Sequence, residues 1–571
     1  MSRDIVERPG ASAQPFYLWS SIPRPKQMLT WPDETLYEGV AAVATSHPDR
    51  RAVVFEETVW SYGDLLAESR ALARGLADLG VSAGDVVAVW LGNRPEWIAC
   101  QLATAALGAA VVAVNTRYRT HELEYMLRDS GASVLVTQDA LRGRDYHEML
   151  ATAVPEVAKQ SAEAFDPASI PDLEAVVSLE PSAALPALRG YDDVLEAGAQ
   201  RESAAFEPAT DPRAPAAIFY TSGTTSEPKG CLQSSRSLLN HAAHVATHLG
   251  VTEDDVGVAT LPFCGIWGYN TLFSVLATGG TLVVQTHFDP GETIRLVDEH
   301  DATSLTGLGV MFERMLEHDV FEPPRVETVG KGVVGFISKG FDEALFDRIE
   351  STFGFPVVQP YGLSEANSQI FVGEPSDPAE RRKRVGGPPI HPAIEAKIVD
   401  PETREERPAG VEGELAIRGY LLADGYLGAP EATAEAFDDQ GWFYTGDLAE
   451  TDADGYVYYR SRLDDALRVR GFLVAPPEIQ TAVEEHPDVY SCEVVGAPHP
   501  RHGEVPVAFV VPDGEALTPG ELEGFLDDRV ADYKVPATFE FVDEFPTTDG
   551  PNGEKVQKTV LRERVRDRFG A

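Results

Sequence analysis

The regular alternation of short apolar runs with helical patterns constrains this chain more than any other feature. Apolar runs of strand length and stretches of helical spacing follow one another at 86–91, 95–107, 109–114, 121–130 and 133–137. Parallel strands need a crossover between them, so this order favours a mostly parallel sheet covered by helices. The alternation resumes at 216–220 and continues past Leu345, which predicts a large α/β domain.

Changes in pattern divide the 571 residues into three parts. We expect an irregular arm over 1–36, an N-terminal domain over 37–463, and a small α+β domain over 464–571. Within the second part, 156–215 is rich in Ala, Pro, Asp and Glu, so we expect a surface connection with one strand, in LEAVVSL. Later runs bounded by glycine, namely GELAIRG, GWFYTGD and GYVYYRSR, predict an antiparallel piece.

Acidic residues outnumber basic ones by 91 to 47, which gives a formal net charge of −44. Such a field repels phosphates, so general nucleic-acid binding is excluded as a first hypothesis. No apolar run reaches the roughly 18 residues of a membrane span, and the first residues form no apolar leader. The four cysteines include no CxxC pair. We therefore expect a cytoplasmic protein without disulfides or a thiolate zinc site.

Lysine is scarce, since only ten of the 47 basic residues are lysine. An acidic, lysine-poor surface fits a halophilic protein in a salt-rich cytoplasm, where ions screen self-repulsion. A genome that prefers arginine is the alternative.

The strongest chemical signal is FYTSGTTSEPKG at 219–230. An apolar strand runs into a loop of hydroxyls and glycine, and a helix begins near Ser234. Backbone N–H groups, hydroxyls and an ammonium group at such a turn favour phosphate binding, although the spacing of a Walker loop is absent. The phosphate-site candidates are Thr221, Ser222, Gly223, Thr224, Thr225 and Lys229. An ordinary turn is the alternative.

Four further segments are weaker when taken alone. They are QPYGLSEA at 359–366, GWFYTGD at 441–447, SRLDD at 461–465 with RGF at 470–472, and NGEKVQK at 552–558. In the first, Tyr361 could stack on a base and Glu365 could hold Mg²⁺. In the second, Asp447 could accept two ribose hydroxyls. Each segment could equally be a turn, a linker or the start of a helix.

Taken together, in this order and spacing, the five segments resemble the AMP-forming acyl-CoA synthetases of the adenylate-forming superfamily. The resemblance spans about residues 37–565. It implies an α/β fold with a large N-terminal domain of stacked mixed sheets and flanking helices, a β-barrel-like piece, and a small mobile α+β C-terminal domain. It also implies ATP, Mg²⁺ and coenzyme A. A carboxylate would attack the α-phosphorus of ATP, and the thiol of coenzyme A would then displace AMP from the acyl-adenylate.

The resemblance assigns roles to the residues at matching positions. Thr221 to Lys229 would cradle the pyrophosphate end of ATP, and Thr221 and Glu365 would hold Mg²⁺. The nucleoside would lie against Tyr361, Gly362, Ser364, Asp447 and Arg462, with adenine at Tyr361 and the ribose at Asp447 and Arg462. Lys555 would reach the carboxylate and the α-phosphate. Asp464 would be the hinge whose rotation exchanges Lys555 for the loop at Gly471.

Several positions depart from the family pattern. Gly265 stands where many members have histidine, so Trp267 is the substitute we expect at the gate of the acyl pocket. Lys339 and Gly340 also fall in the acyl region. Lys339 could recognise a second carboxylate, but we favour an outward position, because lysine is rarely buried without a partner. Glu554 separates Gly553 from Lys555, which leaves Lys558 as the lesser candidate for the catalytic lysine.

These features predict an acid–thiol ligase for a fatty or other apolar-tailed acid. Transfer of the acyl group to a carrier-protein thiol or another acceptor is one alternative, and a non-catalytic nucleotide-binding relative is a distant one. We expect the basic run at 381–384 to be a solvated face, with contact to coenzyme A as the alternative. Cys264 is expected to pack rather than react. No protein partner is required, and a homodimer is left open.

Overall fold

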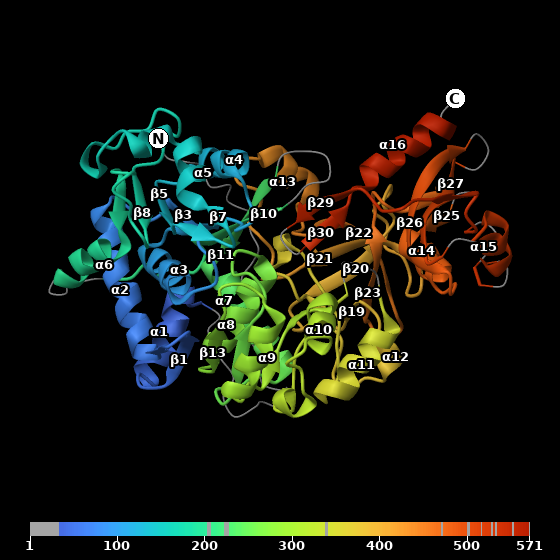
Figure 1. The fold of residues 1–571 in the computed structure, drawn as a ribbon, viewed down its shortest axis with the longest axis horizontal. Helices are drawn as coiled ribbons and strands as arrows, with labels where there is room; N and C mark the ends of the chain where they lie inside the picture. Colours follow the sequence, from blue (N-terminus) through green and yellow to red (C-terminus); the bar gives the residue numbers. More distant parts are fainter. Residues whose placement is uncertain are drawn as a thin grey trace.

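The computed structural model describes residues 33–201, 207–221, 228–336, 341–469, 472–499, 503–514, 517–526, 529–530, 534–550 and 553–569. A large N-terminal part lies at the left and centre of Figure 1, and a smaller C-terminal part lies at the right. The expected arm over 1–36 falls mostly outside these residues.

The central sheet of the N-terminal part has seven strands and is mostly parallel, as the alternation predicts. Its order is β11 (Lys229–Ser234), β10 (Pro215–Thr221), β4 (Ala110–Ala113), β3 (Val86–Trp90), β5 (Val134–Thr137), β8 (Ala175–Ser178) and β9 (Leu188–Gly190). Only β11 runs antiparallel to its neighbour, β10. The β10–β11 hairpin therefore ends the sheet on one side and carries the predicted phosphate segment.

A second sheet stacks against the first across a shared layer of helices. Its order is β14 (Ser304–Leu305), β12 (Val256–Ala259), β13 (Thr281–Val284), β1 (Arg51–Phe55) and β2 (Thr58–Ser61). The helices are α2 (Tyr62–Asp78), α3 (Pro95–Leu107), α7 (Ser235–Leu249) and α8 (Ile266–Leu276). One buried apolar cluster joins Val87 of the first sheet, Trp97 of α3 and Leu282 of the second sheet. Burial of this common core fixes the two sheets relative to each other.

In the segment at 156–215, the strand expected in LEAVVSL is confirmed as β8, but the expectation that the rest is a surface connection is wrong. The segment contains β8, β9 and α6 (Tyr191–Gln200), and α6 packs on α2. A Cβ on Gly198 would lie 1.9 Å from the carbonyl oxygen of Ala71, and a Cβ on Gly75 would lie 2.3 Å from that of Val194. The small residues that suggested a loop instead allow two helices to approach closely.

Glycine-bounded strands form an antiparallel sheet, as expected. Its order is β19 (Gly386–Gly387), β23 (Val457–Arg462), β22 (Phe443–Thr451), β21 (Gly413–Arg418) and β20 (Glu395–Val399). In β22 and β23, Asp447 is paired with Arg462. The register alone therefore places these two predicted ribose ligands side by side.

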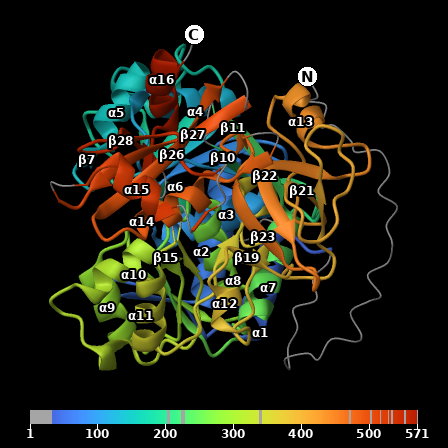
Figure 2. The ribbon, with the colours of Figure 1, turned by 90° about the vertical axis from the view of Figure 1, so that its right-hand side faces the viewer.

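The C-terminal part is a small α+β unit with its own buried clusters. Its sheet contains β24 (Leu467–Val469), β25 (Phe472–Val474), β26 (Val489–His499), β27 (Gly503–Pro512) and β28 (Thr538–Phe541). Its helices are α14 (Pro476–Glu484), α15 (Pro519–Leu526) and α16 (Lys558–Phe569), and a hairpin joins β29 (Thr547–Gly550) to β30 (Gly553–Val556). Figure 2 shows this part from its outer side, with α16 at the top.

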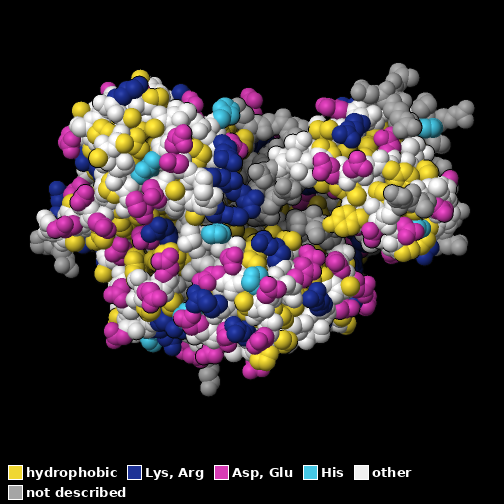
Figure 3. Space-filling model, viewed as in Figure 1, with side chains coloured by type: hydrophobic (Ala, Val, Ile, Leu, Met, Phe, Trp, Pro, Cys, Tyr) yellow, Lys and Arg dark blue, Asp and Glu magenta, His cyan; other side chains and the backbone are white. Residues whose placement is uncertain are grey.

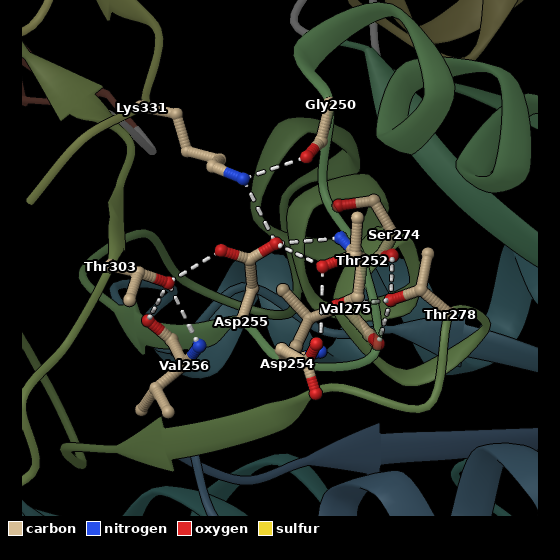
Figure 4. A network of polar contacts seen from close by, with 10 residues as sticks. All are labelled: Gly250, Thr252, Asp254, Asp255, Val256, Ser274, Val275, Thr278, Thr303 and Lys331. Atoms are coloured by element: carbon tan, nitrogen blue, oxygen red, sulfur yellow. Dashed lines mark hydrogen bonds and ion pairs between the residues drawn. The ribbon is translucent and has the colours of Figure 1, made fainter. Parts of the chain in front are cut away.

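A buried carboxylate ties the second sheet to the end of α7 (Figure 4). Asp255 accepts hydrogen bonds from the Thr252 backbone N–H at 2.6 Å and the Thr303 hydroxyl at 2.7 Å, and pairs with Lys331 Nζ at 3.0 Å. Lys331 also donates to the Gly250 carbonyl at 2.7 Å. Burial alone would raise the pKa of Asp255, but these donors outweigh burial and lower it. In the described part of the chain, no helix is long and apolar enough to cross a membrane.

Candidate active site

The β10–β11 hairpin presents two of the predicted ATP ligands at its tip. Thr221 and Lys229 are paired in register, and the Thr221 hydroxyl donates to the Lys229 carbonyl at 3.4 Å. The loop between them, with Ser222, Gly223, Thr224 and Thr225, lies outside the described residues, so its role remains a prediction.

The predicted Mg²⁺ ligand Glu365 lies against the same hairpin. It is in a short 3-10 helix (Ser364–Ala366), whose Ser364 carbonyl accepts from Gln233 Nε2 of β11 at 2.6 Å. The Tyr426 hydroxyl donates to Glu365 Oε1 at 2.9 Å, and Lys229 Nζ lies 5.4 Å from the centroid of the Tyr426 ring. Burial raises the pKa of Tyr426, and the negative charge of Glu365 raises it further. The phenol therefore stays protonated and acts as a hydrogen-bond donor. Tyr426 thus joins a carboxylate and an ammonium group.

The predicted nucleoside ligands meet where Tyr361 of the 359–366 segment lies against β22 and β23 of the antiparallel sheet. The Tyr361 hydroxyl donates to Asp447 Oδ2 at 2.6 Å, and Arg462 Nη1 lies 3.0 Å from Asp447 Oδ1. The Tyr361 ring stacks on Tyr459, with centroids 5.6 Å apart. Gly362 is required here, because a Cβ would lie 2.3 Å from the backbone nitrogen of Gln369.

Asp447 is nearly buried, whereas Arg462 is half exposed. Burial raises the pKa of Asp447 to about 6, against the lowering effect of Arg462. Apart from the ion pair, Asp447 Oδ1 accepts no hydrogen bond from the described residues. A buried carboxylate oxygen of this kind has capacity for a further donor.

The predicted acyl-gate residues stand at the start of α8. A Cβ on Gly265 would meet nothing closer than the Pro262 carbonyl oxygen at 3.5 Å, so packing does not require glycine there. Trp267 is partly buried, and its Nε1 has no hydrogen-bond partner among the described residues. Lys339 and Gly340 lie outside those residues. Cys264 packs against the apolar core, and burial raises its pKa, in agreement with a packing role.

The predicted hinge is tied to the last helix. The Asp464 carbonyl accepts from Arg562 Nη2 of α16 at 3.3 Å, and Arg562 also pairs with Asp465. Lys558 Nζ lies 3.5 Å from Glu493 and 3.8 Å from Asp465, so its charge is already matched. The backbone of Lys555 lies in β30, paired with Thr548. Its side chain and Gly471 are not described.

The basic run at 381–384 is neutralised rather than solvated. Ion pairs join Arg381 to Asp454, Arg382 to Glu350, Lys383 to Glu343, and Arg384 to Glu450. Arg382 is only 8% exposed, so the expectation of a solvated face is wrong at this residue. These partners leave the run poorly suited to binding a free anion.

A different group of arginines has no such partners. This arginine patch consists of Arg117 and Arg119, before α4 (Thr120–Ser130), and Arg142 and Arg144, in the hairpin of β6 (Ala140–Leu141) and β7 (Arg144–Asp145). Arg144 Nη1 donates to the Thr116 carbonyl at 3.3 Å, which joins the two segments. Within the described ranges, none of the four pairs with a carboxylate. Figure 3 shows Lys and Arg gathered beside α4 and β7, at the hollow between the two parts of the molecule.

Sequence comparison identifies the family. The profile described as "AMP-binding enzyme" matches residues 40–427, and "AMP-binding enzyme C-terminal domain" matches 478–550. The chain belongs to the AMP-binding enzyme family. The resemblance inferred from the five segments is thereby confirmed, and so is the fold class.

Relatives of this AMP-binding enzyme are similar over nearly their whole length. Medium-chain acyl-CoA ligase ACSF2 of Rattus norvegicus is 30% identical over 93% of this chain and 88% of the relative. Feruloyl-CoA synthase of Amycolatopsis sp is also 30% identical, over 92% of this chain and 97% of the relative. The crystal structure of ATP-bound MatB from Rhodopseudomonas palustris superposes with a TM-score of 0.79, at 28% identity over 93% of this chain and 99% of that one. Equal identity to ligases named for aliphatic and aromatic acids leaves the acid unspecified.

Proposed function

We propose that this AMP-binding enzyme joins a carboxylic acid to coenzyme A in two steps at one site. It is an ATP-dependent, AMP-forming acyl-CoA synthetase. In the first step a carboxylate oxygen bonds to the α-phosphorus of ATP, and pyrophosphate leaves. In the second the thiolate of coenzyme A bonds to the acyl carbon, and AMP leaves. Use of ATP and coenzyme A fits a cytoplasmic enzyme.

The buried Asp447 carboxylate, with Tyr361 at one oxygen and Arg462 at the other, is the observation that supports the nucleotide site. Each carboxylate oxygen can accept more than one hydrogen bond, so this group can also accept ribose hydroxyls, and the guanidinium group favours its ionised form. Thr221 and Glu365 offer the hard oxygen ligands that Mg²⁺ prefers, and the Tyr426 phenol orients Glu365. When bound there, Mg²⁺ would neutralise phosphate charge.

The arginine patch supports the use of coenzyme A, whose nucleotide end carries several phosphate charges. A chain with a net charge of −44 repels such an anion except where cations are unpaired. Arg142 also has φ 53, in a turn with Gly143 at φ 74, where Asn-Gly is usual. Arginine in this conformation costs stability, and a role for its charge in binding would account for that cost. We propose that the patch holds these phosphates.

The test is AMP release from Mg-ATP in buffered KCl, with short, medium, long, aromatic and dicarboxylic acids, each with and without coenzyme A. We expect AMP release that depends on coenzyme A for one class of acid. Arg142→Ala should raise the KM for coenzyme A about tenfold and leave the KM for ATP unchanged, whereas Arg381→Ala should change neither. AMP release indifferent to coenzyme A would favour a carrier-protein thiol or another acceptor. No release with any acid would favour a non-catalytic relative.

The role of Lys555 can be separated from that of Lys558. We propose that Lys555 neutralises the carboxylate and α-phosphate during adenylation, whereas Lys558 is occupied by Glu493 and Asp465. Lys555→Ala should lower the rate of acyl-adenylate formation at least a hundredfold and spare thioester formation from supplied acyl-adenylate. Lys558→Ala is the matched control and should keep most of the adenylation rate. Equal loss of both steps in Lys555→Ala would refute the assignment.

A further inference from the structure

The loop that carries Glu365 continues into an unusual left-handed stretch. It joins β17 (Pro360–Tyr361) to β18 (Phe371–Val372), and Asn367, Ser368 and Gln369 have φ of 57°, 58° and 38°. Three consecutive residues other than glycine in this region are unfavourable, and such strain persists where the surroundings impose it. The cause here is a set of polar contacts to α7 and α8.

Two buried hydrogen bonds hold this stretch. His241 Nε2 of α7 donates to the Ser368 carbonyl at 2.8 Å, and Gln369 Nε2 donates to Asn270 Oδ1 of α8 at 2.8 Å. All four residues are at most 6% exposed. Trp267 lies one turn before Asn270 on the same face of α8. Together His241, Ser368, Gln369 and Trp267 are called the polar layer.

Each member of the polar layer has one buried atom without a hydrogen-bond partner among the described residues. These atoms are His241 Nδ1, Trp267 Nε1, Ser368 Oγ and Gln369 Oε1. Since His241 Nε2 donates, Nδ1 of the neutral ring is an acceptor, and Gln369 Oε1 is one too. The indole N–H of Trp267 is a donor, and the hydroxyl of Ser368 can both donate and accept. Most buried polar atoms have partners, so these four atoms, carried by residues 241, 267, 368 and 369, have unused capacity for a hydroxyl or carbonyl group.

The polar layer lies close to the reacting centre and carries no charge. Ser368 is three residues beyond Glu365, which is at most about 10 Å along the chain. Burial lowers the pKa of His241 to about 4, and that of neighbouring His391 likewise to about 4, so both rings are neutral at pH 7. A neutral layer attracts hydroxyl or carbonyl groups rather than a second carboxylate.

We propose that the polar layer recognises an uncharged hydrogen-bonding group on the acyl portion of the substrate, so that the preferred acid carries a hydroxyl or carbonyl group a few bonds from its carboxylate. This inference rests on the proposed function and narrows the expectation of an apolar-tailed acid. A plain alkyl chain would leave four buried polar atoms unsatisfied, and such a mismatch is strongly discriminated against.

The test compares acids in matched pairs that differ by one polar group. The pairs are hexanoate with 3-hydroxyhexanoate, pentanoate with 4-oxopentanoate, and benzoate with 3-hydroxybenzoate, which place the polar group a few bonds from the carboxylate. We expect kcat/KM for coenzyme A-dependent AMP release to be at least tenfold higher for the polar member of one pair or more. Equal or lower values for the polar member in every pair would overturn the inference. Preference for a dicarboxylate would also overturn it, and would favour recognition of a second carboxylate by Lys339. Failure of the proposed function is distinct, since no acid would then release AMP.

Two variants connect the preference to the layer. Trp267→Phe keeps the ring but removes the donor, and Ser368→Ala removes the hydroxyl. Each should reduce the ratio of kcat/KM between polar and plain acid at least fivefold. Trp90→Phe is the matched control, because Trp90 Nε1 is also buried without a partner but its ring stacks on Tyr146 in a separate cluster. An unchanged ratio in both layer variants would overturn the assignment, and the ratio is unaffected by partial misfolding.

Discussion

At the scale of single residues, Asp447 shows how burial tunes a ligand. Burial raises its pKa from 3.8 to about 6, so the ionised form, to which we assign ribose binding, is lost as the pH falls through about 6. We expect the KM for ATP to rise several-fold between pH 7 and pH 5 in the wild type. Asp447→Asn should have a high KM that does not change with pH. Steady-state kinetics at several pH values measures this, with exposed Asp454→Asn as the control.

The same shift affects stability in the opposite direction. A raised pKa means that the folded state binds the proton more tightly than the unfolded state, so this carboxyl destabilises the fold as the pH rises from about 4 to about 6. Asp447→Asn should therefore unfold at the same temperature as the wild type, or a higher one, at pH 7. A large fall in that temperature would show that Asp447 is retained for the fold rather than for a ligand.

Candidate residues in short glycine-containing motifs could be selected from the sequence, and isolated ones could not. Tyr361, Glu365 and Asp447 each lie within three residues of Gly362 or Gly446. Tyr426, which the sequence analysis missed, is 61 positions from the Glu365 that it contacts. No local spacing records such a contact, because β11 and the 423–427 segment meet only in the folded sheet.

At the scale of elements, the Asp255 network predicts where the second sheet is most sensitive. Lys331→Met would leave a buried carboxylate without its charged donor, at a cost of about 1–3 kcal/mol of unfolding free energy. Because the pKa of Asp255 is lowered, its contribution is present above its ordinary pKa and is lost as the pH falls through the folded-state pKa. Denaturant unfolding at pH 7 measures the cost of Lys331→Met, and a pH series that extends well below 3.8, the ordinary pKa of the carboxyl group, measures the loss on protonation.

The control for Lys331→Met is Arg295→Met, whose ion pairs to Glu292 and Glu299 are exposed. We expect a change within about 0.5 kcal/mol there. Equal losses of unfolding free energy in Lys331→Met and Arg295→Met would contradict the explanation that the effect of Lys331 comes from the burial of Asp255.

Strands and helices with clean periodicity could be predicted, and elements built of small residues could not. The expected helix at 95–107 matches α3, because Pro95 starts it and Gly108, at φ 72, ends it. In contrast, helix α6 could not be predicted, because its small residues suggest a loop. Gly198 instead allows the close approach of α6 to α2, which depends on the tertiary structure.

At the scale of the whole molecule, the hinge that we propose at Asp464 predicts that the two half-reactions can be separated. Asp464→Pro would fix the backbone where we expect the C-terminal part to turn and would disturb the link to Arg562. We expect acyl-adenylate formation within about threefold of the wild type and thioester formation reduced at least fiftyfold. Single-turnover assays of each step measure this, with Asp464→Ala as the control that keeps backbone freedom. Thioester formation at the full rate in Asp464→Pro would disprove the hinge.

The net charge of the whole molecule predicts how its unfolding temperature depends on salt. With 91 acidic and 47 basic residues, 91 − 47 = 44 negative charges remain even if every basic group is paired, and Figure 3 shows carboxylates spread over the visible face. Their repulsion is screened as the Debye length falls from about 10 Å at 0.1 M salt to about 3 Å at 1 M. Unfolding temperatures in KCl should therefore rise by about 5 °C or more between 0.05 M and 1 M, and continue to rise toward 3 M if the surface is adapted to salt.

Sucrose separates this effect from general exclusion of solutes, since it stabilises compact states without screening charge. A gain in KCl that exceeds the gain in sucrose of equal osmolality supports electrostatic relief. A gain that ends near 0.5 M indicates simple screening of an acidic protein, and no gain at all disproves the halophilic reading. The scarcity of lysine would then reflect a genome that prefers arginine, because arginine replaces lysine at exposed positions with no change in net charge.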